Sequence, residues 1–467
     1  MFLADASPYA AAPSFLNSGD TAWQLTAATF VGIQSIPGLA ILYGGVVKKK
    51  WALNSAVMCF YAFSIVLLVW VLWAYNMSFG DPLKIPGPPF LQATVGVPHP
   101  AVLPDAEIGQ ANIPLAASGM PSLRFAGSAM IFFQFVFAAI TPILIAGAVL
   151  ARMNFRAWMI FVPLWTTFVY SVGAFMLWGG GWLAQLGAVD YSGGYVIHLA
   201  AGVSGFVAAA VVGPRLLEDR RDFEPNNLIM ALAGAGLLWL GWNGFNGGDP
   251  YFANADAAAA VLNTNIATAL ALLSWLVLDM VATGKPNAVS MINGEIVGLV
   301  AITPCAGFVN GYGAIAVGLI AGIIAWFSMN KLGKTNLMKR VDDTLGVIHT
   351  HGVAGLVGGL SAGIFADPRM LEYVSIDKKT SAVSVTGLLY GNPKQLWIQF
   401  LAALTIIVYD AIGTFIILKF ISLIVPLRAS DTEVEGGDLA IHGIDPVPMY
   451  VPPAGAAMKA AGGAPAS

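Results

Sequence analysis

A short pattern, H-x-x-A-G-x-x-G, occurs twice within long apolar stretches and constrains this chain more than any other feature. One copy begins at His198, in YVIHLAAGVSGF, and the other begins at His351, in HTHGVAGLVGG. Offsets of three, four and seven residues lie along one face of a helix, so each copy predicts a histidine above a smooth surface of Ala and Gly. Such surfaces let two helix backbones approach closely. Because ionisable groups are costly at membrane depth, the duplicated histidine indicates a functional pair near the midplane.

The composition places these helices in a membrane. Of the 467 residues, 57% are hydrophobic and 10% are charged, and a soluble protein of this length would need more surface charge. The net charge of −3 gives no reason to expect nucleic acid as a partner. Cys59 and Cys305 lie in apolar runs, so we expect them to pack rather than to form a disulfide. The N-terminus lacks a basic region and a long apolar core, and no signal peptide is expected.

The apolar stretches predict an all-α integral membrane protein with about 11 transmembrane helices. The first two spans are expected at about 20–47 and 51–79, the fifth carries His198, and the tenth carries His351. The expected division is an extracellular N-terminal segment at 1–19, a transmembrane domain at 20–426 and a cytoplasmic tail at 427–467, each with bounds read from the sequence.

Lysine and arginine decide the expected orientation, because cytoplasmic loops carry an excess of them. With the N-terminus outside and the C-terminus inside, most of these residues fall on the inner side: Lys48–Lys50, Arg152, Arg156, Arg215, Arg220, Arg221, Lys285, Lys331, Lys334, Lys339, Arg340 and Arg428. Spans one to five and six to ten are then inverted relative to each other. The expected architecture is a 5+5 inverted repeat with one further C-terminal helix, and a site between the halves.

Several stretches together resemble the ammonium transporter (Amt/Mep/Rh) family, in particular its Amt branch. They are DTAW…PGLAILYGG, FQFVFAAIT, WGGGWLAQLGAVDYSGGYVIH, GWNGFNGGD, GEIVGLVAITPCAGFV and HTHGVAGLVGG. They cover nearly all the spans in the family's order and spacing. The resemblance implies a homotrimer in the cell membrane, with one pore per subunit, that takes up ammonium or ammonia as a nitrogen source. It implies neither an enzyme nor a cofactor.

The resemblance also assigns roles to single residues. It makes His198 and His351 the twin histidines that line the pore, whereas the alternative is that each is a core histidine bonded to a backbone carbonyl. Phe137 and Phe245 match the two stacked phenylalanines of the gate, and Trp178 matches the tryptophan at the outer mouth.

Other polar residues are expected to be structural. Asp190, just before the span of His198, is expected to cap that helix rather than to bind a cation directly. We treat His349 as structural, because a position two residues from His351 faces elsewhere on a helix.

Discrimination against potassium needs more than the aromatic mouth. An aromatic face attracts any desolvating cation by about 0.5–2 kcal/mol. Ammonium can shed a proton and cross as ammonia, which hydrogen-bonds to imidazole, whereas potassium cannot. Apolar gates around a dry pore make it costly to carry an intact charge.

The chain departs from the family in three spans and in the tail. Asp249 stands where the family usually has Ser, and the sequence favours cation recruitment by its carboxylate, with a solvated surface turn at Asp249-Pro250 as the alternative. Glu295 and Asp410 lie within spans, where we expect polar contacts between helices or subunits. The stretch TEVEGGDLAIHG resembles the family's cytoplasmic tail, but Ile444-Asp445-Pro446 replaces its usual continuation. A PII signalling protein at the cytoplasmic face is inferred from the resemblance alone.

Two other functions compete with transport. An ammonium sensor with little flux is one, although no soluble output domain is visible in this sequence. An intramembrane enzyme with the paired histidines as metal ligands is the other. No third ligand accompanies His198 and His351 in a recognisable motif such as H-E-x-x-H, so no metal site is expected.

Overall fold

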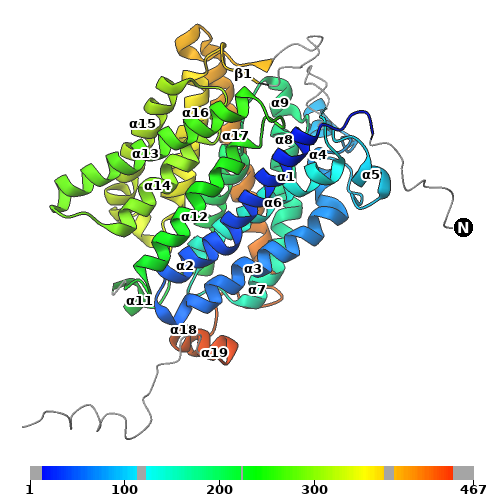
Figure 1. The fold of residues 1–467 in the computed structure, drawn as a ribbon. Helices are drawn as coiled ribbons and strands as arrows, with labels where there is room; N and C mark the ends of the chain where they lie inside the picture. Colours follow the sequence, from blue (N-terminus) through cyan, green and yellow to red (C-terminus); the bar gives the residue numbers. More distant parts are fainter. Residues whose placement is uncertain (1–12, 113–122, 222–223, 373–382, 445–467) are drawn as a thin grey trace, which may run out of the picture.

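The computed structural model describes residues 13–112, 123–221, 224–372 and 383–444, which form a bundle of long, roughly aligned helices (Figure 1). The first half contains α1 (Ser18–Ile33), η1 (Gln34–Leu39), α2 (Ala40–Val46), η2 (Lys49–Trp51), α3 (Ala52–Val69), η3 (Trp70–Ala74), α4 (Tyr75–Phe79), η4 (Pro89–Ala93), α5 (Pro104–Ile108), α6 (Gly127–Val149), α7 (Phe155–Trp165), η6 (Thr166–Tyr170), α8 (Ser171–Leu177), α9 (Trp182–Leu186), η7 (Gly194–Leu199), α10 (Ala200–Val212) and α11 (Leu217–Arg221).

The second half contains α12 (Leu228–Gly247), α13 (Ala255–Thr283), α14 (Ala288–Ile302), α15 (Gly311–Asn330), η8 (Leu332–Lys334), η9 (Met338–Arg340), η10 (Ile348–Val353), α16 (Ala354–Phe365), η11 (Leu388–Tyr390), α17 (Pro393–Ser422), α18 (Asp431–Gly436) and α19 (Asp438–His442). A two-residue antiparallel ribbon, β1 (Leu371–Glu372) with β2 (Val383–Ser384), pairs Leu371 with Ser384.

Among the described residues, 9 helical stretches are long and apolar enough to cross a membrane. The first two, Ser18–Val46 and Lys49–Phe79, agree closely with the expected spans. The shorter apolar helix α14 and the continuous segment of η10 and α16 occupy the expected places of spans eight and ten. The structure therefore confirms an all-α membrane protein, while the total of about 11 crossings remains a prediction.

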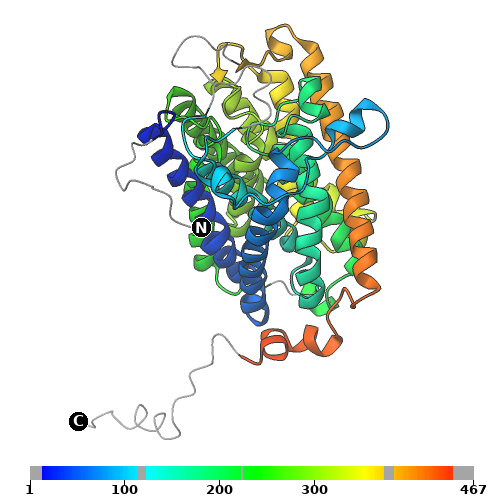
Figure 2. The same ribbon diagram turned by 90° about the vertical axis from the view of Figure 1, so that its right-hand side faces the viewer.

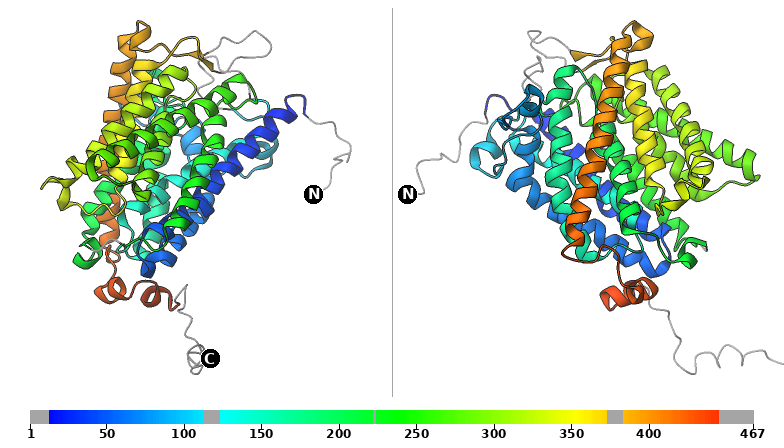
Figure 3. Two further views of the ribbon diagram at one scale, coloured as in Figure 1. Left: turned by 60° about the vertical axis from the view of Figure 1, so that its left-hand side comes forward. Right: turned by 180° about the vertical axis from the view of Figure 1, so that it is seen from behind.

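Helix α6 forms the centre of the bundle. Nearly all of its side chains are buried, because neighbouring helices surround it on every side. Helix α17, by contrast, runs along the outside of the bundle over its full height (Figure 3). It presents large apolar side chains outward, including Trp397, Leu404, Ile412 and Phe420. Lipid or a neighbouring subunit must cover such a surface.

Most of the residues expected on the cytoplasmic side meet at one end of the bundle. Arg152 is fully buried there and donates to the carbonyl oxygens of Ala148, Gly213 and Asp342. Burial lowers the pKa of this guanidinium to about 10. Arg215 donates to both carboxylate oxygens of Asp342 at 3.0 and 2.7 Å. These contacts tie three connecting loops together, in keeping with the expected sidedness, which itself remains a prediction.

The described part of the tail lies across this same end (Figure 2). Asp438 of α19 accepts hydrogen bonds from the backbone N–H groups of Leu53 and Asn54, both at 2.8 Å. Those groups open helix α3, so a carboxylate of the tail caps a membrane helix. Lys50 donates to the carbonyl oxygen of Val434 at 3.2 Å. The tail is thus docked on the bundle as far as residue 444, whereas Asp445 and Pro446, where the tail is predicted to depart from the family, lie outside the described residues.

The two copies of the histidine pattern pack against each other at glycine residues, where no side chain separates the backbones. A Cβ added at Gly202 would lie 2.3 Å from both Cα and N of Gly352. A Cβ at Gly355, the counterpart of Gly202 in the other copy, would lie 2.6 Å from the carbonyl oxygen of Gly194. Both distances are shorter than real side chains tolerate, so glycine is required for the observed approach. The small-residue surface expected from the sequence is confirmed.

This contact predicts a large effect for a small change. Gly202→Ala should push the two helices apart and lower the stability of the protein by about 1–3 kcal/mol. The midpoint of thermal unfolding of the purified protein in detergent measures the loss. Gly236→Ala in α12 is the matched control, since nothing lies within 4 Å of its added Cβ, and its midpoint should stay the same or rise slightly. Equal midpoints for the two variants would contradict the close packing.

Candidate functional site

His198 and His351 face each other at the junction of the two duplicated helices. His198 lies in η7 and His351 in η10, and each element widens into a π-helical turn before its α-helix begins. Their Nδ1 atoms are 3.3 Å apart, and their rings are inclined by 25°. Both side chains are buried. Because one Nδ1–H must donate to the other Nδ1, the two rings have opposite tautomers, one with a proton on Nε2 and one without.

Asp190 fixes the start of the helix that carries His198. Its Oδ2 accepts hydrogen bonds from the backbone N–H groups of Tyr195 at 2.9 Å and Val196 at 3.0 Å. Between them the chain turns at Gly193, whose φ of 103° favours glycine. Burial raises the pKa of the Asp190 carboxyl to about 6, against the opposing effect of the backbone N–H groups. The geometry agrees with the expected capping role.

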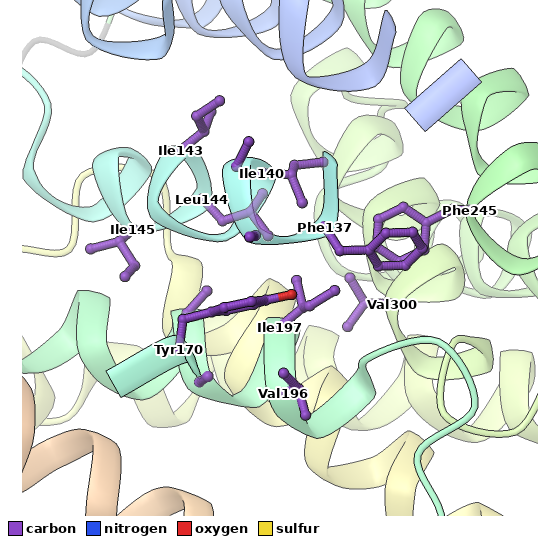
Figure 4. Close-up of a cluster of buried hydrophobic side chains, with 14 of the residues drawn as sticks. Phe137, Ile140, Ile143, Leu144, Ile145, Tyr170, Val196, Ile197, Phe245 and Val300 are labelled. Carbon is purple, nitrogen blue, oxygen red and sulfur yellow. The ribbon is translucent and has the colours of Figure 1, made fainter. Parts of the chain in front are cut away.

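Aromatic rings close the side of the histidine pair that lies away from the tail. Phe137 of α6 and Phe245 of α12 are both fully buried, with ring centroids 4.4 Å apart (Figure 4). Trp178, at the end of α8, meets Phe137 edge to face at 6.5 Å and is only partly buried. Its Nε1–H donates to the carbonyl oxygen of Asp190 at 2.7 Å. The structure thus brings all three predicted aromatic residues together in one column above His198.

Trp242 belongs to this column, although the sequence reasoning did not select it. Its ring stacks on His198 with centroids 5.3 Å apart and on Phe245 at 4.7 Å. Its Nε1–H donates to Oγ1 of Thr303 at 2.8 Å, which holds the indole in place. Trp242 precedes Phe245 by three residues, and i,i+3 positions share a helix face. That spacing was the signal available in the sequence.

Asp249 lies beside the same column and is buried. Only 4% of its surface is exposed, so the alternative of a carboxylate in bulk water is wrong. It is hydrogen-bonded to Oγ of Ser192, and that hydroxyl also lies 2.8 Å from the carbonyl oxygen of Phe245. Burial raises the pKa of the Asp249 carboxyl well above its usual range, and the hydrogen bond from Ser192 opposes this only in part.

Below the histidine pair, a cavity of about 990 Å³ opens toward the end of the bundle where the tail lies. His351 and His349 both contribute to its wall. His349 hydrogen-bonds through Nδ1 to Oγ of Ser328 at 2.8 Å, so it does face away from the pair, as expected. The histidine pair is therefore open on the side that faces the tail, whereas the opposite side is closed by Phe137 and Phe245.

The remaining predicted polar residues lie apart from this column. Glu295 and Asp410 are buried, and within the described ranges Oε1 of Glu295 and Oδ2 of Asp410 have no hydrogen-bond partner. Cys59 and Cys305 are buried free thiols. In the part of the chain that the structure describes, no group of three or more His, Cys, Asp or Glu side chains could hold a metal ion.

The chain is similar to known proteins over almost its whole length. The sequence model of the Ammonium Transporter Family matches residues 22–445. "Ammonium transporter 3 member 3" of Oryza sativa subsp. japonica is 50% identical over 445 residues, which are 92% of this chain and 90% of that protein. "Ammonium transporter 2" of Arabidopsis thaliana is 50% identical over 434 residues, 92% of this chain and 88% of that one. The crystal structure of Saccharomyces cerevisiae Mep2 superposes with a TM-score of 0.76 at 29% identity, covering 90% of this chain and 89% of the other.

The cap formed by Asp190 predicts a loss of stability when its carboxyl group is removed. Asp190→Ala leaves the N–H groups of Tyr195 and Val196 without their acceptor and should cost about 1–3 kcal/mol. Asp190→Asn keeps one acceptor oxygen and should cost less. Thermal unfolding of the three proteins in detergent gives the order, and an Ala variant as stable as wild type would contradict the capping role.

The same carboxyl group predicts a dependence on pH. Its pKa of about 6 in the folded protein exceeds its ordinary value, so the folded state holds the proton more tightly. The resulting stabilisation is complete below about pH 4 and is lost as the pH rises through 6. The stability of wild type relative to Asp190→Asn should therefore fall between pH 4 and pH 7.

Proposed function

This chain belongs to the ammonium transporter family, a family of multi-pass membrane transporters rather than enzymes, and we propose that it conducts ammonia through the column built around His198 and His351. In this proposal ammonium is recruited at the outer mouth, loses a proton there and crosses as ammonia. The released proton follows separately along the imidazole pair. The single observation that carries the proposal is the 3.3 Å contact of the two buried imidazoles directly beneath the aromatic column.

Recruitment is assigned to Trp178, Phe137 and Asp249. Trp178 is the partly exposed member of the column, and its ring attracts a cation by about 0.5–2 kcal/mol as water is stripped away. A nearby cation also favours the ionised form of Asp249, which burial alone disfavours. The arriving ammonium thereby strengthens its own acceptor. This attraction acts on every monovalent cation, so it supplies affinity and not selectivity.

Selectivity is assigned to the gate of Phe137 and Phe245. The two rings are packed at 4.4 Å and leave no polar atom to replace a hydration shell. An intact cation would have to pass them without partners, which is costly at this depth. Ammonium avoids the cost by leaving its proton behind, whereas potassium has no such route.

Conduction is assigned to the Nε2 atoms of the two histidines, which do not take part in the contact between the rings. Among the described residues, Nε2 of His198 has no hydrogen-bond partner and is shielded from solvent. The opposite tautomers of the two rings offer one N–H donor and one lone pair. Ammonia, which donates and accepts, can bind to both kinds of edge. Exchange of the tautomers would pass a proton along the pair.

We place the protein in the cell membrane as a homotrimer with the tail inside, and we take the PII signalling protein as its partner on that face. The exposed apolar faces of α13 and α15, with Leu262, Val277 and Ile315, suit a neighbouring subunit or lipid. The tail, capped onto α3 through Asp438, lies at the end where such a partner would dock.

The twin histidines are tested by replacement. His198→Ala and His351→Ala should each abolish selective ammonium-driven current in proteoliposomes on a solid-supported membrane, while thermal unfolding shows a folded protein. An internal pH dye, read alongside the current, separates ammonia flux from proton flux. His99→Ala removes an exposed loop histidine and should leave the current unchanged. Wild-type current and wild-type exclusion of potassium in both pore variants would remove the pair from the conduction path.

Asp249 is tested by restoring the residue that the family usually has. Asp249→Ser should raise the half-saturating ammonium concentration and largely keep the maximal current. Because burial raises the pKa of this carboxyl, ionisation requires higher pH. The advantage of wild type over the Ser variant should therefore grow as the outer pH rises. An unchanged half-saturation at every pH would leave Asp249 with a purely structural role.

A further inference from the structure

His349 is a third histidine beside the pore, and the mechanism above does not use it. It belongs to η10, as does His351, and 8% of its surface is exposed. Its Nδ1 is engaged by Oγ of Ser328 from α15 at 2.8 Å. The ring is therefore held in a fixed orientation through Nδ1, which leaves Nε2 as the nitrogen that could exchange a proton.

That other nitrogen, Nε2, lies over the backbone of Gly333. A Cβ added at Gly333 would come within 2.9 Å of it, so any larger residue would press on the ring. Gly333, His349 and His351 all line the same cavity. The cavity thus joins the inner edge of the histidine pair to a second imidazole nearer the basic end of the bundle.

Charged side chains approach His349 from some of the neighbouring elements and not from others. On its own stretch these are His351 and Asp343, and η8 brings Lys334 to the same cavity. Helices α14 and α15 add only neutral side chains to the wall, such as Asn293 and Met329, because Glu295 does not reach it. The other charged residues of the wall are Arg220, Arg221, Lys339 and Asp342. A positive excess disfavours a permanently charged ring, so His349 is suited to carry a proton only briefly.

We propose that His349, oriented by Ser328, is an inner proton-exchange site for ammonia that leaves the histidine pair, an inference that rests on the proposed function. Nε2 takes a proton from water: an O–H bond of the water breaks, hydroxide remains in the cytoplasmic solution, and the ring becomes imidazolium with an Nε2–H donor. Ammonia entering the cavity accepts that proton: the Nε2–H bond breaks, a new N–H bond forms on ammonia, and the ring returns to neutral imidazole. The product is ammonium, which the basic cavity wall repels toward the cytoplasm.

Ser328 acts as a positioning residue in this scheme. Its hydroxyl can either donate to Nδ1 or accept from it, so it can stabilise both the neutral and the protonated ring. Without it the ring could still accept protons, but its orientation over Gly333 would be lost. Ser328→Ala should therefore weaken the same property that replacement of His349 removes.

The test varies the internal pH of proteoliposomes at fixed external ammonium and pH. His349→Gln keeps a side chain able to bond Ser328 but cannot exchange a proton. We expect it to bind ammonium at the outer mouth with wild-type half-saturation. Its maximal current should fall by about 100-fold, the lower end of what a positioned proton donor contributes, and the dependence of that current on internal pH should disappear. Ser328→Ala should show a smaller change in the same direction. Met329→Leu, a change of similar volume in the same cavity wall, should keep the wild-type profile.

The outcomes separate this inference from the proposed function. If wild type carries no ammonium-dependent current, the proposed function itself fails. If wild type conducts and His349→Gln keeps the full dependence on internal pH, the inner site is refuted while the twin-histidine pore stands. A drop in current with an unchanged pH profile would show a merely structural role for His349 and would equally overturn the inference.

Discussion

The contact between the backbones at Gly202 and Gly352 sets the distance on which the centre of the protein depends. His198 lies one helical turn before Gly202 and His351 directly precedes Gly352, so the approach of the two glycines also sets the positions of the two histidines. Larger residues would separate the helices and with them the Nδ1 atoms that now lie 3.3 Å apart. Lipid tails are as apolar as the helix surfaces, so the hydrophobic effect does not drive helices together in a membrane. Close packing of this kind must therefore supply much of the attraction. The arrangement of the site is therefore a consequence of the same packing that holds the bundle together.

The buried polar side chains along the column differ in the hydrogen-bond partners that stabilise them. At the end of the column near Trp178, Oδ2 of Asp190 accepts hydrogen bonds from backbone N–H groups, and Asp249 is hydrogen-bonded to a hydroxyl. The adjoining side chains of Phe137 and Phe245 carry no polar atom. Below these rings, His198 and His351 are joined through their Nδ1 atoms, and the basic loops lie at the end of the bundle where the tail docks. In the pathway that we propose, an ion would meet partners on either side of these two rings and none between them, which favours passage of a neutral molecule.

Much of this could be predicted from the sequence, because some patterns depend only on neighbours along the chain. The spans at 20–47 and 51–79 follow from runs of apolar residues, and the structure places them at Ser18–Val46 and Lys49–Phe79. Asp190 could be expected to cap because it precedes a helix by a few residues. His349 could be expected to face away from His351 because residues two positions apart point to different sides of a helix. None of these inferences requires knowledge of what lies on the neighbouring helix.

The sequence by itself determined the class of protein, the first two spans, the duplicated histidine pattern and, through resemblance, the residues of the column other than Trp242. Only the tertiary structure decided what those residues touch. It buried Asp249 against Ser192, packed the ring of Trp242 against His198, and set His349 against Ser328 on the wall of the cavity below the histidine pair. Each of these contacts joins residues from separate segments of the chain. The rotation of one helix relative to another depends on the packing of the whole bundle. The pattern of residues along a single helix therefore does not predict it.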